Sequence, residues 1–181
     1  TSKALWEQAL RAASVRALIP DYQADFATVR KTVDEAVYER KTQMTVHSQL
    51  LQALPKKLFF YEKGTAVLLD KNTVQVTKDD GSAKTFTADY ILLAPGSRPR
   101  KPANIAVDEQ IIVTSDGIRN FSTFPESMVV LGAGVIGCEF ATIFSGFGKT
   151  KVNLIDKADR ILPFEDEDIA AIVKDNLEKN G

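Results

Sequence analysis

The residues Gly-Ala-Gly-Val-Ile-Gly at positions 132–137 decide the fold, because they join an apolar strand to a helix. Residues 128–131 predict a short buried strand, and residues 135–148 predict a helix from the spacing of their apolar side chains. A second apolar strand follows at 152–155 and ends at Asp156. Strand, helix and strand span the roughly 30 residues of a dinucleotide-binding βαβ unit, which predicts an α/β fold with a parallel sheet.

Each of the three glycines has a physical task in such a unit. Gly132 permits the tight turn, Gly134 lets a pyrophosphate approach the backbone, and Gly137 lets the helix lie close to the strand. The pyrophosphate is expected at the first helical turn, where unpaired N–H groups and the positive end of the helix dipole favour an anion. The helix should bury the apolar side chains that recur along it, which are those of Ile136, Phe140, Ile143 and Phe144.

Asp156 predicts which dinucleotide binds. Its carboxylate lies 19 residues after Gly137, where it would accept hydrogen bonds from the ribose hydroxyls and repel a 2′-phosphate. This favours NAD(H) over NADP(H). The cations of Lys157 and Arg160 follow closely and weaken the discrimination, so the sequence predicts a preference and not a strict choice.

Other residues that could in principle take part in catalysis or metal binding have structural explanations. Cys138 is the one cysteine, and its place in the first turn of a packed helix predicts a buried structural thiol. His47, the one histidine, is expected to be solvated on a long helix. The acidic run at 165–168 is expected to open a helix, where carboxylates complement the dipole, so no metal site is predicted.

Away from the motif, the spacing of apolar residues changes from helical to strand-like and back. Helices are predicted at residues 2–18 and 25–54, and the apolar stripe of the second is expected to pack. Short strands of a β-meander and its continuation are predicted at 58–61, 65–69, 73–77, 84–87 and 90–93. A proline-rich connector at 99–104 predicts a domain boundary. After it we expect a strand at 111–113, a short helix at 115–120, and a helix at 165–179 that Asn180-Gly181 ends.

The overall composition excludes two classes of partner. The chain has 181 residues, of which 44% are hydrophobic, and a net charge of -1, as in a globular protein with a sizeable core. This charge gives no field for nucleic acid or anionic lipid, and the sequence has no apolar run long enough to cross a membrane. We therefore expect neither a nucleic acid nor a membrane as partner.

Several of these segments resemble one enzyme family. Residues 132–140 (GAGVIGCEF), 151–156 and 159–168 (DRILPFEDED) resemble the NAD-binding half of the pyridine nucleotide-disulfide oxidoreductases. Residues 90–99 (YILLAPGSRP) resemble the second FAD motif of this family, and the start of the chain, Ser-Lys-Ala-Leu, resembles the helix after its redox-active cysteine pair. The resemblance implies parts of two Rossmann-like dinucleotide-binding domains.

By this resemblance, residues 1–101 are the C-terminal portion of an FAD-binding domain, and residues 102–181 are the first part of an NAD(H)-binding domain. Glu139 would lie beside the flavin and pair with Lys3 near flavin N5, and Ile136 would lie against the nicotinamide. The residues expected to bind NAD(H) are Gly132, Gly134, Val135, Ile136, Gly137, Glu139 and Asp156. Those expected to contact FAD are Lys3, Gly64, Ala94, Pro95 and Gly96. Pro95 departs from the family, which usually has threonine there, and proline has no N–H to donate to a flavin.

The implied activity is electron transfer between NAD(H) and a disulfide or dithiol substrate through bound FAD, as in dihydrolipoamide dehydrogenase. A soluble NAD(P) transhydrogenase, in which the flavin passes hydride between two nucleotides, is the first alternative. A non-catalytic nucleotide-binding regulator is the second, since fold does not fix function.

The resemblance also concerns the whole protein. The redox cysteines and an acid-base histidine are expected outside this chain, which lacks an initiator methionine and which we interpret as an internal piece, inactive alone. No catalytic residue is therefore expected within it. A homodimer in the cytoplasm that acts on a small-molecule or lipoyl-type disulfide is implied for the full-length protein.

Overall fold

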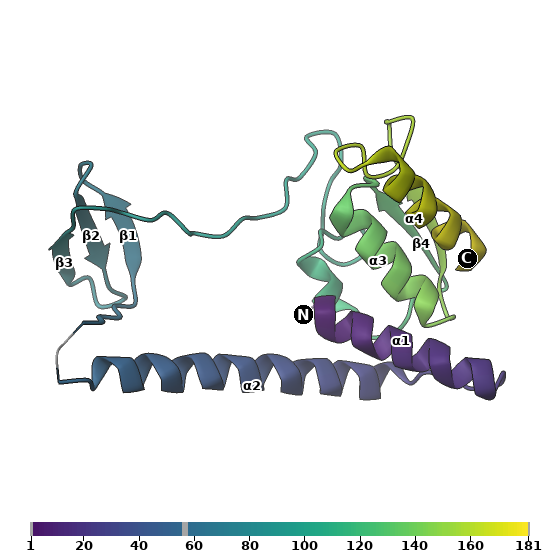
Figure 1. The fold of residues 1–181 in the computed structure, drawn as a ribbon, viewed down its shortest axis with the longest axis horizontal. Helices are drawn as coiled ribbons and strands as arrows, with labels where there is room; N and C mark the ends of the chain where they lie inside the picture. The colour runs from purple at the N-terminus through teal and green to yellow at the C-terminus, as the bar shows by residue number, and fades with distance from the viewer. Residues whose placement is uncertain (1, 56–57, 181) are drawn as a thin grey trace. The chain divides into compact units, whose positions relative to one another are not determined.

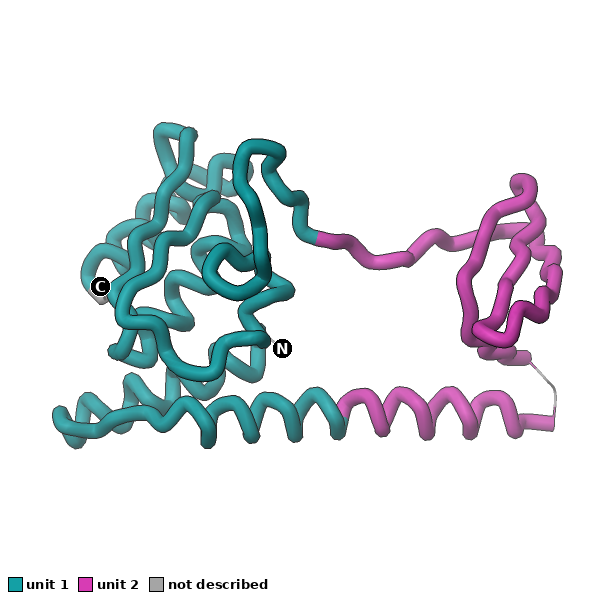
Figure 2. The backbone as a smooth tube through the Cα atoms, turned by 180° about the vertical axis from the view of Figure 1, so that it is seen from behind, with its two compact units in different colours: residues 1–39, 99–181 teal, residues 40–98 magenta. Residues whose placement is uncertain are grey.

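The computed structural model describes residues 2–55 and 58–180 and groups them into two compact units (Figure 2). The first unit contains residues 1–39 and 99–181, and the second contains residues 40–98. The junction at 98/99 falls at the start of the proline-rich connector. The first unit also includes the N-terminal residues, because the units are defined by contacts in space and not by order in the sequence. The predicted division into an FAD-binding portion and an NAD(H)-binding portion therefore stays a prediction. Gly181, expected to end the last helix, lies outside the described residues.

Two long helices begin the chain (Figure 1), and their bounds lie close to those predicted. They are α1 (Ser2–Leu18) and α2 (Phe26–Gln52). Asp25, expected inside the second helix, precedes it and caps its start. Its Oδ2 accepts hydrogen bonds from Thr28 N at 2.8 Å and from Thr28 Oγ1 at 2.7 Å, which satisfies one of the free N–H groups at the helix start.

The apolar stripe of α2 is only partly buried. Val29 and Val33, near its start, are 7% and 6% exposed, whereas Met44 and Leu51 are 64% and 43% exposed. The prediction that the whole stripe packs is therefore wrong for the second half of the helix. Helical periodicity reports that a face is apolar, and packing also requires another element over that face. His47 is exposed, as expected.

The second unit contains an antiparallel β-meander whose strands pair in chain order. They are β1 (Thr65–Leu68), β2 (Thr73–Thr77) and β3 (Ala83–Thr87). Both connecting turns are held by aspartates: Asp70 Oδ1 accepts from Asn72 N, and Asp80 Oδ1 accepts from Ser82 N, each at 2.8 Å. The side chain of Glu62 joins the sheet through Lys78 Nζ at 2.5 Å.

Three predicted strands are wrong. Residues 58–61, 90–93 and 111–113 form no strand in the structure. Their apolar residues give a strand-like pattern, but a strand also needs a neighbouring backbone to take its hydrogen bonds. No described strand lies beside them in either sheet. Tyr90 and Leu92 are accordingly 93% and 92% exposed.

The C-terminal residues form the predicted βαβα unit. Its elements are β4 (Ser127–Leu131), α3 (Val135–Gly146), β5 (Lys151–Ile155) and α4 (Glu167–Asn180), preceded by the 3-10 turn η1 (Gly117–Asn120). β4 and β5 are parallel, with Ser127 opposite Lys151 and Leu131 opposite Ile155. The expected α/β class and the parallel pair are confirmed.

One face of this parallel pair is covered and the other is open. Met128 and Val152 pack against the core that includes Phe140, Ile143 and Phe144 of α3. Val129 and Leu131, which alternate with the covered positions, are 58% and 63% exposed. The prediction of a buried strand at 128–131 is therefore correct for one face only.

α1 lies along α3, although the two helices are far apart in the sequence (Figure 1). Small residues permit the approach, because a Cβ placed on Gly146 would lie 3.2 Å from the Cβ of Ala9. Arg16 fixes the far end of α1: its Nη2 donates to Gly146 O at 2.7 Å, and its Nη1 donates to Phe147 O. The Arg16 guanidinium thus caps the C-terminal end of α3.

Residues 2–55 and 58–180, which the structure describes, contain neither a membrane-spanning helix nor a metal-binding cluster. No helix there has the length and apolar character needed to cross a membrane. No group of three or more His, Cys, Asp and Glu side chains in the same residues is arranged to hold a metal ion.

Candidate functional site

The turn from β4 into α3 requires two of its glycines for the fold itself. Gly132 has φ +107°, which residues with a side chain rarely adopt, and its N–H donates to Ile155 O at 2.8 Å. A Cβ on Gly137 would lie 1.8 Å from Gly132 O. The short distance between α3 and the end of β4 therefore requires glycine at position 137, because any side chain there would overlap the backbone of Gly132.

Gly134 has a different environment. Its φ of -77° suits any residue, and a Cβ placed on it would meet no atom of the described residues within 4 Å. Nothing in the described part of the chain therefore demands glycine here. The open space lies over the backbone at the N-terminus of α3, where the first N–H groups of a helix have no partner within it. This is the space that a pyrophosphate would fill, and the residues fit a bound dinucleotide.

The first turn of α3 exposes its apolar side chains. Val135 and Ile136 are 62% and 59% exposed, whereas Phe140, Ile143 and Phe144 are buried. The inward orientation predicted for Ile136 is wrong, because this residue precedes the part of α3 that packs on the sheet. Its exposure leaves it free to contact a ligand.

Asp156 is tied directly to the glycine-rich turn. Its Oδ2 accepts a hydrogen bond from Ala133 N at 2.6 Å, and its Oδ1 accepts one from Ala158 N at 2.8 Å. These two hydrogen bonds hold the pKa of the carboxyl below its ordinary value, with that from Ala133 the larger cause. Asp156 is therefore an ionised, exposed acceptor beside the turn at neutral pH.

Cys138 is a buried structural thiol, as predicted. Its Sγ donates a hydrogen bond to Ala133 O at 3.5 Å. The pKa of the thiol is raised, mainly because the thiol is buried and to a lesser extent because the negative charge of Asp156 is near. A raised pKa keeps the thiol protonated and poorly nucleophilic.

The expected pair of Lys3 and Glu139 lies within the first unit. Lys3 is exposed near the start of α1, and Glu139 is half-buried in α3. Among the described side chains, no ion pair within 4.0 Å joins the two. The pairing, and the role of both residues beside a flavin, stay predictions.

The other residues expected to contact FAD lie in the second unit. Ala94, Pro95 and Gly96 are exposed and belong to no strand, and Gly96 has φ +75°. Gly64 has a reason of its own to be glycine, since a Cβ there would lie 2.5 Å from Thr77 O in β2. Their contacts with FAD are not tested by this arrangement and stay predictions.

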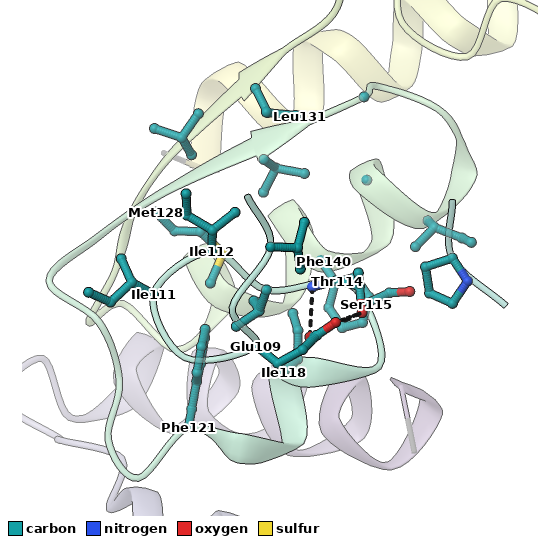
Figure 3. A pocket seen from close by; sticks show the side chains of 18 of the residues that line it. Glu109, Ile111, Ile112, Thr114, Ser115, Ile118, Phe121, Met128, Leu131 and Phe140 are labelled. Carbon is teal, nitrogen blue, oxygen red and sulfur yellow. Dashed lines mark hydrogen bonds between the residues drawn. The ribbon is translucent and has the colours of Figure 1, made fainter. Parts of the chain in front are cut away.

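A large cavity adjoins the glycine-rich turn (Figure 3). Its volume is about 1160 Å³, and residues of β4, of the loop at 105–125 and of the first turn of α3 line it. Glu109 braces this loop: its carboxylate accepts from Thr114 N at 3.1 Å and pairs with Lys101 Nζ at 3.2 Å. Ile136 lies in its lining, next to the turn.

Sequence reasoning missed two residues of this region. Glu109 has φ +58° and Leu162 has φ +49°, and Leu162 N donates to Ala133 O at 2.8 Å. Neither residue type signals a left-handed conformation, so the sequence offered no local sign of these contacts.

The comparison with protein-family models decides the affiliation of the chain. Residues 3–181 match the model described as "Pyridine nucleotide-disulphide oxidoreductase". The chain belongs to this family. The expected family and the Rossmann-like α/β fold are confirmed. Members of the pyridine nucleotide-disulphide oxidoreductases are flavoprotein oxidoreductases that use FAD and NAD(P), so the expected enzyme class and cofactors are confirmed at the level of the family.

Curated relatives of the family are similar over part of this chain. The soluble pyridine nucleotide transhydrogenases of Yersinia pestis (strain Pestoides F) and Yersinia pseudotuberculosis (serotype O:1b) are each 42% identical over 118 residues. This alignment covers 65% of the chain and 25% of each relative. The chain thus matches about a quarter of the length of these relatives.

Two solved structures share the fold of this chain. LpdA from Mycobacterium tuberculosis superposes with a TM-score of 0.81 at 23% identity, over 99% of this chain and 39% of that one. The HOCl-induced flavoprotein disulfide reductase RclA of Escherichia coli, in a complex with Cu(II), superposes with a TM-score of 0.71 at 22% identity, over 99% and 37%. At these identities the likeness concerns the fold alone.

Proposed function

We propose that this chain supplies the NAD(H) site of a FAD-dependent oxidoreductase. The observation that carries the proposal is the hydrogen bond from Ala133 N to Asp156 Oδ2, which sets an ionised carboxylate directly beside the glycine-rich turn. A dinucleotide whose pyrophosphate lies over Gly134 would then present its adenosine ribose to Asp156. The carboxylate would accept hydrogen bonds from both ribose hydroxyls.

The other residues of the turn would divide the work of binding. The N-terminus of α3 offers N–H groups and a positive dipole end to the pyrophosphate. Ile136, exposed at the edge of the cavity, would provide an apolar contact for the nicotinamide and exclude water from it. Bound FAD would supply the flavin that exchanges hydride with the nicotinamide. Lys3, Gly64, Ala94, Pro95 and Gly96 are proposed to contact it, with Glu139 beside Lys3.

The electron partner is the finer part of the proposal. The transhydrogenase relatives, 42% identical over 118 residues, support hydride transfer between two pyridine nucleotides. Transfer to a lipoyl-type disulfide, as in dihydrolipoamide dehydrogenase, was the leading expectation from sequence. It is kept as the second candidate, because the family description names disulphide oxidoreductases.

Absorbance spectroscopy of the protein at its full natural length tests the proposal. Purified protein should show bound flavin, and anaerobic NADH should bleach it. Asp156→Asn should raise the NADH concentration needed for half-bleaching about tenfold while the oxidised flavin spectrum stays unchanged. A protein that binds NADH but takes up no flavin after reconstitution would contradict the oxidoreductase proposal and favour a regulator.

A second assay separates the two electron partners. The NADH-reduced protein is mixed with a thio analogue of NADP⁺ or with lipoamide, and reoxidation of the flavin is followed. Rapid reoxidation by the nucleotide alone supports the transhydrogenase, and rapid reoxidation by lipoamide supports the disulfide enzyme.

We further propose a homodimer in the cytoplasm for the full-length protein, which light scattering and cell fractionation can check.

A further inference from the structure

Arg160 organises the loop that joins Asp156 to α4. Its Nη1 donates a hydrogen bond to Leu162 O at 3.0 Å. Its Nη2 donates to Pro163 O at 3.1 Å and to Glu165 O at 3.0 Å. One planar guanidinium therefore gathers three carbonyl groups from neighbouring residues, which a side chain with a single cationic nitrogen cannot reproduce in the same geometry.

The same loop is attached to the glycine-rich turn through Leu162. Leu162 N donates to Ala133 O at 2.8 Å, and its buried side chain packs with Cys138 and Ala170. The φ of Leu162 is +49°, a conformation that leucine adopts rarely and that surrounding contacts must hold. The hydrogen bonds of Arg160 supply part of that hold, since one of them ends on the carbonyl of Leu162 itself.

Ala133 is the point where these contacts meet. Its carbonyl accepts from Leu162 N at 2.8 Å, and its N–H donates to Asp156 Oδ2 at 2.6 Å. The turn that would carry the pyrophosphate and the carboxylate that would bind the ribose are thus fixed to each other. The loop organised by Arg160 contacts the turn through the Leu162 N–H.

We infer that Arg160 is a positioning residue for the nucleotide site, because its bonds to the loop carbonyls fold residues 157–166 so that Leu162 anchors Ala133 beside Asp156. The inference rests on the proposed NAD(H) site. It replaces the expectation that the Arg160 cation weakens selection against NADP(H): the guanidinium is engaged by its own loop, and binding a 2′-phosphate would require it to leave those carbonyls.

Nucleotide titrations of the full chain separate positioning from phosphate binding. Dissociation constants for NADH and for NADPH are measured by fluorescence for wild type, Arg160→Met, Arg160→Lys and Lys157→Gln. Lys157→Gln is the matched control, since it also removes one positive charge near Asp156 but from an exposed side chain outside the carbonyl network. Arg160→Met and Arg160→Lys should each weaken NADH binding about tenfold and leave the ratio of the two constants unchanged, because they loosen the loop. Lys157→Gln should weaken NADH binding less than about twofold.

Hydrogen exchange without nucleotide gives a readout that does not depend on binding. The amide of Leu162 should exchange at least about tenfold faster in Arg160→Met than in wild type, whereas amides of β2, which belongs to the second unit, should not change. An unchanged rate at Leu162 would overturn the inference. Wild-type NADH affinity in Arg160→Lys would also overturn it, because a positive charge alone would then be sufficient at this position. A loss of NADPH binding without a loss of NADH binding in Arg160→Met would overturn it as well. A wild-type chain that binds no NADH would refute the proposed function instead, and the exchange at Leu162 would still test the role of Arg160.

Discussion

Gly134 and Gly137 belong to one motif, yet the fold needs only the second. A Cβ on Gly137 would overlap Gly132 O, whereas one on Gly134 would enter open space. The two positions therefore separate the demands of folding from those of ligand binding. A glycine that the protein itself does not need indicates what the turn is for.

Gly134→Ala should keep the fold and lose the nucleotide. The backbone at Gly134 is compatible with alanine, so the free energy of unfolding should change by less than about 1 kcal/mol. The new methyl group would occupy the space of the pyrophosphate and should weaken NADH binding at least about tenfold. Urea unfolding and fluorescence titration measure the two quantities on the same sample.

Gly137→Ala is the matched substitution, with the opposite balance. Its methyl group must displace α3 from the end of β4, which should cost about 2–3 kcal/mol of unfolding free energy. Equal losses of stability in the two variants would contradict the division of roles between these glycines.

The carboxyl of Asp156 should make stability depend on pH only in acid. Its pKa is lowered from 3.8 by hydrogen bonds that exist only in the folded state, so its contribution is complete above that value and is lost as the pH falls through the lower folded pKa. Asp156→Asn should therefore differ from wild type by the same unfolding free energy at about pH 5 and about pH 7, and this difference should shrink below 3.8. Urea midpoints measured across this range check it. A difference that grows toward low pH would mean that the two backbone hydrogen bonds do not form in solution.

At the scale of the element, the sequence predicted those segments whose partners lie in the chain. β4, α3 and β5 were predicted within a few residues, because the apolar spacing, the glycine turn and the parallel neighbour all agree. Residues 58–61 and 90–93 have the same strand-like composition but no neighbouring strand among the described residues. Local pattern indicates what a segment can form, and pairing decides what it does form.

The candidate site shows the same limit. The glycines and Asp156 could be predicted, because each residue type has a known task at its spacing. The anchoring of Ala133 by Leu162 could not, since a leucine at φ +49° follows from contacts between distant residues and not from its own preference. Arg160 appeared in the sequence only as a charge, and its hydrogen-bonding geometry gives it a different role.

The packing of α1 on α3 predicts a strong effect at a residue remote from the site. Arg16→Ala removes two charge-assisted hydrogen bonds to the C-terminal carbonyls of α3 and should lower the free energy of unfolding by about 2 kcal/mol. Arg11→Ala, an exposed arginine on the same helix, should change it by less than about 0.5 kcal/mol. Urea unfolding compares the two variants, and equal effects would contradict the capping role of Arg16.

At the scale of the whole molecule, the chain leaves large apolar surfaces open. Val129, Leu131 and Ile155 are more than half exposed on one face of the parallel pair, and the chain matches only about a quarter of the length of its curated relatives. An exposed apolar patch on a protein favours association with other surfaces. In this chain the open sheet face is the site where such association is expected.

Val129→Lys should reduce that association. The side chain lies on the open face, so the charge can stay in water, and both binding of an apolar fluorescent dye and self-association in size-exclusion chromatography should fall. Val152→Lys places the same charge on the covered face against the core and should unfold the βαβα unit. Unchanged dye binding in Val129→Lys would mean that the apolar surface responsible for association is not the open sheet face.

The single buried thiol of Cys138 allows local opening of the structure to be measured by the rate of its chemical modification. With one cysteine in 181 residues, any reaction with a colourless disulfide reagent that releases a coloured product reports one position. Because that position is enclosed at the start of α3 and donates to Ala133 O, the reagent must wait for this end of the helix to come apart. The rate of colour appearance therefore counts openings of the glycine-rich turn in real time, without any label. The proposed nucleotide should slow this reaction as its occupancy of the turn rises, so the reaction rate would also measure nucleotide binding.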